Sequence, residues 1–532
     1  MNLRQSNIDK LGTQDFDVLI VGGGINGAVS AAALAARGAK VALIDARDFA
    51  GFTSQHSSNL VWGGIKYMEG YEFGLVSELC KSRNELLRSF PSTVKEIRFL
   101  MTIHRKFRFH PWVILASTWL YWLFGRGQTR TPSLVSQARL KQIEPLINTD
   151  ISIGGVEYSD AFLHDNDARF VFNFVQSAMD RGCIAANYVR LDQAKRENDG
   201  WRARVTDQID GKSIEVRARV MINAAGAFVD PINATCGIET RHRHVLSKGI
   251  HLIVPKISEE HRVLAFFADD ERLFFAIPMA NRTCIGTTDT RVEDPVTEVT
   301  EADRQFVLDN INARLDLPNP LGAGDIIAER CGVRPLAVPS NDKSTNVQQL
   351  SRRHVIETIN DERHISVFGG KLTDCLNVGD EICDEVQRLG IGLESPSRWY
   401  GEPGPEARES FFQRVRTLGL DSTVAEDTGE ALAERLWRRY GAKAEGMLDA
   451  IEGNPELVEP MIENTGIRKC EIDHLVQNEM IVKLEDYLRR RSKIELLISR
   501  DTLRQSTGLF EACEKLFGDQ AQQKFDEYFD SD

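Results

Sequence analysis

The chain has 532 residues, of which 42% are hydrophobic, 27% charged and 8% aromatic, as is typical of soluble globular proteins. Its formal net charge of −13 opposes non-specific binding to nucleic acid. Nine cysteines without a C-x-x-C pair, and the absence of an H-E-x-x-H motif, indicate neither a disulfide framework nor a metal site.

The first fourteen residues predict no secretory signal. Arg4, Asp9 and Lys10 stand among amides there, and the apolar core that a signal peptide needs is missing. We therefore expect a cytoplasmic protein.

A β-α-β unit for binding a dinucleotide follows. Residues 16–21 form an apolar strand that leads through a G-x-G-x-x-G turn (Gly22, Gly24 and Gly27) into an alanine-rich helix. A second apolar run, residues 40–44, ends at Asp45, whose carboxylate can accept a ribose hydroxyl. The glycines permit a tight turn and close approach of the backbone to a pyrophosphate at the helix N-terminus.

Residues 54–71 are loop-like and residues 72–90 predict a helix. Residues 111–124 are nearly all apolar and have basic residues on both sides, but fourteen residues are too few to span a bilayer. Two interpretations stay open: a buried core helix, or an interfacial anchor at an anionic membrane. The aromatic side chains of the anchor would be Trp112, Trp119, Tyr121 and Trp122, beside His104, Arg105, Lys106, Arg108 and Arg126.

The middle of the chain, residues 150–365, is rich in strands and is typical of a substrate-binding domain. It contains apolar runs at residues 216–223, 251–254 and 273–277 and a helix at residues 301–315. Beyond Thr373 the chain becomes helical and charged. Residues 400–532 predict a separate helical domain, after a linker near Pro396 to Pro405.

Two further turns indicate which dinucleotide is bound. The strand Val220–Asn223 ends in the small residues Ala225 and Gly226, as in the A-T-G segment of flavoproteins. Gly369-Gly370-Lys371 follows another strand and opens a helix, whose positive end can face an anionic isoalloxazine. Because no second G-x-G-x-x-G motif offers a nicotinamide site, the three turns together predict FAD.

The sequence resembles the FAD-dependent glycerol-3-phosphate dehydrogenases and oxidases of the aerobic, respiratory type. The matching segments stand in family order at residues 22–28, 57–67, 71–73, 248–251, 286–289, 332–336 and 368–373, and residues 488–493 resemble the motif of the family's helical domain.

The resemblance implies an α/β fold: a Rossmann-like FAD-binding domain, a strand-rich substrate domain of the D-amino-acid-oxidase-like type, and a C-terminal helical domain. The oxidoreductase region is then residues 1–395. Its FAD-binding segments are about 16–75, 170–245 and 355–395, its substrate segments about 76–169 and 246–354, and the helical domain is 396–532.

The resemblance also implies a set of site residues. Arg334 matches a substrate-binding arginine, Lys371 a lysine near flavin and substrate, and Arg352 or Arg353 offers a second contact to phosphate. Lys66 and Tyr67 complete the expected substrate site. The expected cofactor residues are Gly22, Gly24, Asn26, Gly27, Asp45, Ser57, Ser58, Gly63, Gly64, Ala225, Gly226, Gly370, Lys371, Leu372 and Thr373.

The chain departs from the family on the substrate side. Asn59, Trp62 and Lys66 stand where the family usually has lysine, histidine and arginine, and Thr373-Asp374-Cys375 replaces Thr-Thr-Tyr. The missing histidine is a favoured candidate for the catalytic base, which leaves His251 and His56 as the remaining nearby histidines. We expect His251, Lys371 and Arg334 to be the catalytic residues, with His251 as the candidate base.

The expected reaction is oxidation of sn-glycerol 3-phosphate, or a related phosphorylated secondary alcohol, by hydride transfer to flavin N5. Electrons would pass to a membrane quinone from a protein on the inner face of the cytoplasmic membrane, and a homodimer is compatible with the sequence. Two alternatives stay open: a flavin oxidase of a hydroxy acid or amine that uses dioxygen, and a non-catalytic flavoprotein, which the replacement of histidine by Trp62 allows.

Overall fold

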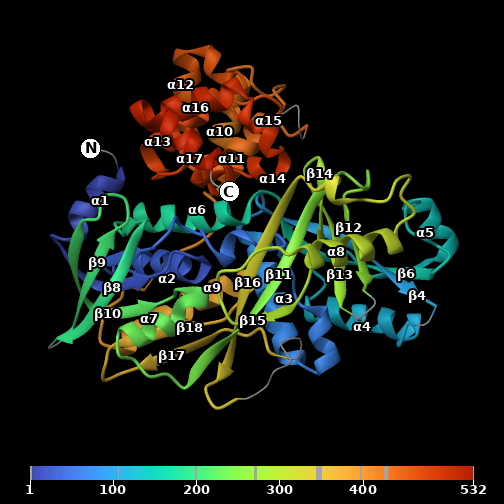
Figure 1. The fold of residues 1–532 in the computed structure, drawn as a ribbon, viewed down its shortest axis with the longest axis horizontal. Coiled ribbons are helices and arrows are strands. Elements are labelled where there is room, and N and C mark those ends of the chain that lie inside the picture. The colour runs from blue at the N-terminus through green and yellow to red at the C-terminus, as the bar shows by residue number, and fades with distance from the viewer. Residues whose placement is uncertain are drawn as a thin grey trace.

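The structure is a computed structural model that describes residues 3–105, 107–197, 200–268, 272–342, 350–395, 398–424 and 429–530. Of the predicted features, Lys106 in the basic flank of the apolar run and Pro396 in the linker lie outside the described residues. The chain forms two sheets side by side and a helical unit stacked against helix α6 (Figure 1).

The first sheet has eight strands and a parallel centre in which β1 lies between β10 and β2. Its order is β17 (Val355–Ile359), β18 (His364–Phe368), β10 (Ser213–Asn223), β1 (Asp15–Val21), β2 (Val41–Ile44) and β7 (Ile184–Ala186), with β9 (Gly200–Asp207) and β8 (Val189–Glu197) added beside β10. Helix α2 (Ile25–Ala36) is almost entirely buried, because its alanines pack against the sheet, α6 (Asp167–Met179) and α9 (Cys375–Arg388). The central strands are apolar for the same reason: both faces of the sheet are covered.

The second sheet has ten strands. Its order is β15 (Thr290–Val292), β11 (His242–Pro255), β14 (Arg282–Gly286), β13 (Leu273–Met279), β12 (Arg262–Phe267), β4 (Val94–His104), β6 (Ser152–Leu163) and β3 (Leu60–Val61), with β16 (Ala328–Pro339) paired to β11 and β5 (Ser133–Ser136) to β6. The long pair β11–β16 is antiparallel, and its register sets His251 opposite Arg330 and Gly249 opposite Gly332.

The remaining helices of the oxidoreductase region are α1 (Leu3–Leu11), α3 (Phe73–Ser89), α4 (Pro111–Phe124), α5 (Gln137–Ile143), α7 (Val229–Thr235) and α8 (Glu301–Arg314). The helices predicted at residues 72–90 and 301–315 are therefore present as α3 and α8. Helix α1 was not predicted from the sequence, and an ion pair of 2.6 Å from Arg4 to Asp207 holds it to the first sheet.

The C-terminal unit has its own apolar core, formed around Trp437, Leu448, Ile472 and Tyr487. Its helices are α10 (Pro405–Thr417), α11 (Leu432–Tyr440), α12 (Ala444–Gly453), α13 (Lys469–Asn478), α14 (Ile494–Leu497), α15 (Arg500–Arg504), α16 (Thr507–Phe517) and α17 (Ala521–Phe529), with a π-helical turn at Asp486–Arg491. The arrangement confirms the predicted fold class: a Rossmann-like α/β domain, a strand-rich domain and a C-terminal helical domain.

The apolar run at residues 111–124 forms α4. One side of this helix is buried in the core and the other side is exposed. Tyr121 is buried and donates a hydrogen bond of 2.5 Å to Asp160, so this residue belongs to the core rather than to an anchor. Trp112 and Leu123 on the same helix are 63% and 60% exposed. In the described part of the chain, no helix combines the length and apolarity needed to cross a membrane.

Candidate active site

The glycine turn joins β1 to α2. Gly22 has a φ of +104°, a conformation that favours glycine, and a Cβ on Gly27 would lie 1.8 Å from the Gly22 carbonyl oxygen. A Cβ on Gly24, by contrast, would have only the Ser54 hydroxyl within 4 Å, at 3.1 Å. Gly22 and Gly27 are thus required by the turn itself, whereas Gly24 leaves room in front of the helix N-terminus.

Asp45 stands at the end of β2 and braces this turn. Its Oδ2 accepts a hydrogen bond of 2.6 Å from the Gly23 amide, and its Oδ1 accepts one of 2.8 Å from the Arg47 amide. Burial raises the pKa of Asp45 to about 6, against the opposing effect of these two backbone donors. Each carboxylate oxygen has a second acceptor site, which suits a ribose hydroxyl.

The other two predicted turns follow β10, which is paired with β1, and β18, the next parallel strand along. Asn26 at the start of α2 donates a hydrogen bond of 3.0 Å to the Gly369 carbonyl, while its buried Oδ1 has no partner among the described residues. Gly370 has a φ of +101°, and Gly226 has a φ of +58° with no atom within 4 Å of the Cβ it lacks. The N-terminus of α2, the free face of Gly226 and the unpaired amide oxygen of Asn26 fit FAD at this edge of the sheet.

Ser57 is held in place by residues that the sequence analysis missed. Its amide and hydroxyl donate to Asp167 Oδ2 at 2.9 and 2.8 Å, and Arg330 Nη1 donates to its carbonyl at 2.6 Å. Arg330 also bonds Asn59 Oδ1 at 2.9 Å, so Asn59 serves as a buried structural link. Asp167 and Arg330 stand outside every motif, and only the folded chain brings them together.

The predicted glycines Gly63 and Gly64 have packing reasons of their own. A Cβ on Gly63 would lie 2.3 Å from the Tyr121 hydroxyl oxygen, so this glycine lets the loop approach α4. Gly64 has a φ of +78° and begins the 3₁₀ turn Ile65–Gly70 that carries Lys66 and Tyr67. Both side chains in that turn are half-buried.

A cluster of two arginines and one carboxylate lies on the second sheet. Asp289 Oδ2 is 3.0 Å from Arg352 Nη2, and Asp289 Oδ1 is 3.6 Å from Arg334 Nη1. Arg334 extends over Gly249, where a Cβ would lie 2.1 Å from its Nη2, and donates to Thr287 Oγ1 at 3.0 Å. Burial and the neighbouring Arg352 lower the pKa of Arg334, while Asp289 opposes the shift. One carboxylate cannot neutralise two guanidinium groups, so the cluster keeps a net positive charge.

Lys371 lies close to the same cluster. Its Nζ is 4.1 Å from the ring centroid of Tyr67 and 5.4 Å from that of Trp62, which makes a cation–π contact with each ring. Thr373 ties the flavoprotein turn to this region through a hydrogen bond of 3.3 Å to the Trp62 carbonyl. The indole of Trp62 therefore lies beside Lys371, and the Trp62 backbone is bonded to Thr373.

His251 is 2% exposed, and neither ring nitrogen has a hydrogen-bond partner among the described residues. Burial, with added repulsion from Arg330 and Arg334, lowers its pKa well below the ordinary value, so the ring is neutral. His251 stands two residues beyond Gly249 on the same face of β11, about 7 Å along the strand from the glycine that Arg334 covers.

The predicted residues thus gather into two groups. The turns that contain Gly22–Gly27, Asp45, Gly226 and Gly370 line the carboxyl edge of the first sheet, with Ala225 and Leu372 in the same turns and Ser58 beside Ser57. Arg334 and His251 lie on strands of the second sheet, and Arg352, Tyr67 and Lys371 come from neighbouring turns and loops. Asp289 was overlooked although it ends the quoted Gly286–Asp289 segment, so a signal for it was present in the sequence.

Two family models match the chain. The model for FAD dependent oxidoreductases, of the DAO type, covers residues 17–368, and the model for the C-terminal domain of alpha-glycerophosphate oxidase covers residues 404–524.

Curated relatives match over most of their length. The chain is 32% identical to a glycerol-3-phosphate dehydrogenase of Pseudomonas aeruginosa, over 91% of this chain and 93% of the relative. It is 30% identical to the aerobic glycerol-3-phosphate dehydrogenase of Escherichia coli, over 91% of this chain and 95% of the relative.

Solved structures show the same fold. The glycerol-3-phosphate dehydrogenase from Bacillus halodurans, complexed with FAD, aligns with a TM-score of 0.72 at 22% identity, covering 99% of this chain and 97% of that one. The L-alpha-glycerophosphate oxidase of Mycoplasma pneumoniae, with FAD bound, aligns with a TM-score of 0.55 at 14% identity, covering 73% of this chain and 98% of that one.

Proposed function

Because the chain belongs to the family of FAD-dependent glycerol-3-phosphate dehydrogenases and oxidases, we propose that it oxidises sn-glycerol 3-phosphate, or a related phosphorylated secondary alcohol, to the ketone. FAD is its cofactor. The observation that carries the substrate proposal is the cluster of Arg334, Arg352 and Asp289, which has two cations for one anion.

The residues that would hold FAD are the glycine turn, Asp45, Ser57 and the turns at Gly226 and Gly370. Bound FAD supplies a hydride acceptor at its N5 atom. The chain contributes the helix N-terminus of α2 to the pyrophosphate and Asp45 to a ribose hydroxyl.

The arginine cluster would bind the phosphate of the substrate. A guanidinium group offers parallel N–H donors that match two phosphate oxygens, and the surplus positive charge of the cluster would attract a phosphate dianion. Gly249 is what allows Arg334 to lie flat on the sheet, since any side chain there would collide with the guanidinium.

His251 would accept the hydroxyl proton. Its free nitrogens and neutral ring are suited to receiving a proton, while the low pKa makes that proton costly to keep. A phosphate dianion beside Arg334 offsets the guanidinium charge that depresses this pKa, so substrate binding would itself strengthen the base. Lys371, held by Tyr67, contributes positive charge beside the reacting oxygen.

Electrons would leave for a membrane quinone, with the protein attached to the inner face of the cytoplasmic membrane through α4. Trp112 and Leu123 on this helix are exposed, as is Tyr71 at 81% in the neighbouring turn. Such a patch of aromatic and aliphatic side chains suits the headgroup boundary of a bilayer.

Turnover assays test the reaction and the acceptor together. Purified protein given glycerol 3-phosphate and a soluble quinone should form dihydroxyacetone phosphate and reduced quinone in equal amounts. Formation of hydrogen peroxide at the same or higher rate with dioxygen alone would instead identify an oxidase, and absence of product with either acceptor would contradict the proposed substrate.

A further inference from the structure

A segment that covers the cofactor turn, residues 48–57, makes direct contact with the glycine turn. The Ala50 amide donates to the Gly23 carbonyl at 3.0 Å, and the Ser54 hydroxyl accepts a hydrogen bond of 3.0 Å from the Ile25 amide in the first turn of α2. The Phe49 ring packs so closely that a Cβ on Gly23 would lie 2.4 Å from it. The position of this covering segment therefore determines the shape of the expected pyrophosphate site.

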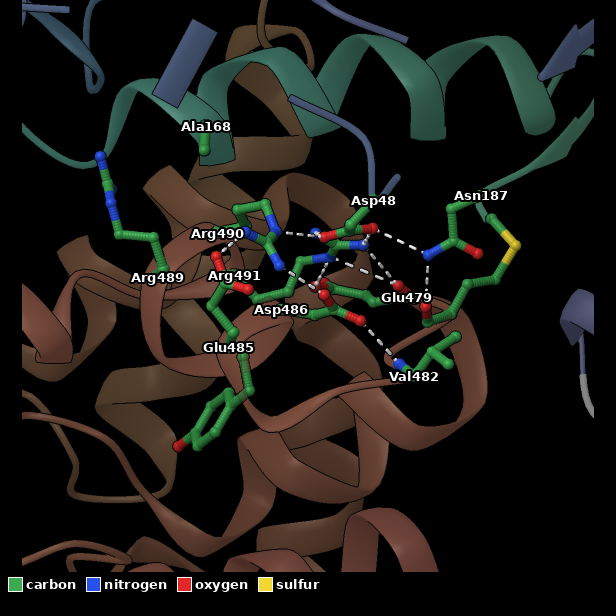
Figure 2. A network of polar contacts seen from close by, with 12 residues as sticks. Asp48, Ala168, Asn187, Glu479, Val482, Glu485, Asp486, Arg489, Arg490 and Arg491 are labelled. Atoms are coloured by element: carbon green, nitrogen blue, oxygen red, sulfur yellow. Dashed lines mark hydrogen bonds and ion pairs between the residues drawn. The ribbon is translucent and has the colours of Figure 1, made fainter. Parts of the chain in front are cut away.

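The start of the covering segment is held by the C-terminal domain. Asp48 is 1% exposed and receives two hydrogen bonds from Arg491, at 2.7 and 2.9 Å, and one from Arg490 Nε at 2.8 Å. Asn187 adds a fourth donor at 2.8 Å. Figure 2 shows Arg490 and Arg491 directed toward Asp48 and Asn187, whereas Arg489 points away from them.

The far end of the covering segment is held by the same π-helical turn. Arg490 Nη1 donates to Gln55 Oε1 at 3.1 Å, while its Nη2 is fixed by Asp486 at 2.6 Å. Arg490 thus contacts both Asp48 and Gln55, seven residues apart, with one planar group. It is 3% exposed, so these bonds are made away from water.

Arg489 reaches the last residue of the segment indirectly. Its carbonyl accepts a hydrogen bond of 2.6 Å from Asn166 Nδ2, and its Nη1 lies 3.3 Å from Asn166 Oδ1. The next residue, Asp167, accepts both hydrogen bonds from Ser57. Three consecutive arginines of the C-terminal domain are therefore connected to Asp48, Gln55 and Ser57 of the ten-residue covering segment.

Opposite charges stabilise the contact between Asp48 and the two arginines Arg490 and Arg491. Burial raises the pKa of Asp48, but Arg491 and Arg490 outweigh it and hold the pKa below its ordinary value, so the carboxylate stays ionised. A lysine in place of Arg490 would keep the charge but could not contact Asp48, Gln55 and Asp486 at once, because it lacks the planar fork.

We propose that Arg490, with Arg491 and Arg489, is a positioning residue for FAD: the C-terminal domain fixes the covering segment, and so sets the affinity of the glycine turn for the cofactor. The inference rests on the FAD site of the proposed function. It implies that FAD binding and docking of the C-terminal domain strengthen one another.

The test compares two substitutions of the same kind. Arg490→Lys removes the link to Gln55, whereas the control Arg435→Lys changes an equally buried arginine whose partner Glu471, at 2.7 and 3.1 Å, lies within the C-terminal domain. Apoprotein titrated with FAD, followed by quenching of flavin fluorescence, should show a Kd at least tenfold weaker for Arg490→Lys and within twofold of native for Arg435→Lys. Hydrogen exchange at residues 49–55 of the apoprotein should be faster only in Arg490→Lys.

A milder substitution, Gln55→Met, keeps every charge and tests the proposal if Arg490→Lys does not fold. We expect this variant to bind FAD with a Kd three- to tenfold weaker than that of the native protein. Native Kd values in Gln55→Met and Arg490→Lys, or equal weakening in Arg435→Lys, would overturn the inference. A native apoprotein that takes up no FAD would instead overturn the FAD site, so the two failures are distinguishable.

Discussion

At the scale of single residues, the expected phosphate site gives a quantitative prediction for Arg334. Arg334→Ala should raise the KM for glycerol 3-phosphate about thirtyfold, corresponding to about 2 kcal/mol for loss of one charge-assisted partner that is partly open to solvent. Arg334→Lys should fall between the native protein and Arg334→Ala, because an ammonium cannot bind two oxygens side by side. Steady-state kinetics of the three proteins check this order, and a KM unchanged in Arg334→Ala would exclude the residue from phosphate binding.

His354 gives a prediction about pH. Burial opposes its protonation, but hydrogen bonds to Asp374 at 2.8 Å and Glu381 at 3.1 Å outweigh burial and raise its pKa to about 9. Since the folded pKa exceeds the ordinary 6.5, the stabilisation is complete below pH 6.5 and is lost as pH rises to about 9. The full shift corresponds to about 3 kcal/mol, which is the upper bound of this stabilisation.

Urea unfolding between pH 6 and 9.5 measures this effect, and His354→Asn should flatten the decline in unfolding free energy. His364 is a matched control, because burial lowers its pKa to about 4 and it stays neutral throughout that range. Above about pH 7.5, where the imidazole is neutral in the unfolded protein as well, His364→Asn should shift the curve without changing its slope. A decline as steep in His354→Asn as in the native protein would show that other groups cause it.

The departures from the family were readable in the sequence, but their consequences were not. Trp62 and Asp374 could each be recognised as replacements, yet sequence alone could not show Lys371 lying against the rings of Trp62 and Tyr67, or His354 paired with Asp374. The contacts of Lys371 join residues about 300 positions apart, the pair His354–Asp374 joins two residues 20 positions apart, and both depend on side-chain geometry. We also predict that oxidation of glycerol 3-phosphate is slow, because Trp62 stands where the family usually has histidine.

At the scale of elements, the glycine turn, α3 and α8 were predictable because each has a periodic or punctuated pattern of its own. Helix α4 was ambiguous because its sequence is apolar on all sides. Its buried side, Ile114, Thr118 and Tyr121, is set by packing against the second sheet, and no period in the sequence marks it.

The exposed side of α4 carries the membrane prediction. The double substitution Trp112→Gln and Leu123→Gln should abolish sedimentation of the protein with anionic vesicles while leaving flavin content unchanged. The structure favours these two positions over Trp122, whose indole donates a hydrogen bond of 2.7 Å to the Thr129 carbonyl. A control with Ile209→Gln and Val476→Gln, exposed apolar residues on other elements, should sediment as the native protein does. Equal loss from the control would point to non-specific adhesion.

At the scale of the whole molecule, composition and motif order were enough to predict three structural units and one cofactor. Composition and motif order could not predict which residues make the contacts between these units. The triplet Arg489, Arg490 and Arg491 was recognisable as a family motif, but its partners Asp48 and Asp167 lie more than 300 residues away in sequence. Buried ion pairs of this kind become visible only when the domains are placed together.

We propose that this chain oxidises a phosphorylated secondary alcohol with its own FAD. Anaerobic titration of the purified holoprotein with glycerol 3-phosphate tests it most directly, because bleaching of the flavin requires no assumption about the final electron acceptor. We predict that glycerol 3-phosphate bleaches the flavin, slowly, and that glycerol at the same concentration does not. The proposed function would be contradicted if glycerol 3-phosphate did not bleach the flavin, while an unphosphorylated alcohol or an amine bleached it equally in the native protein and in Arg334→Ala.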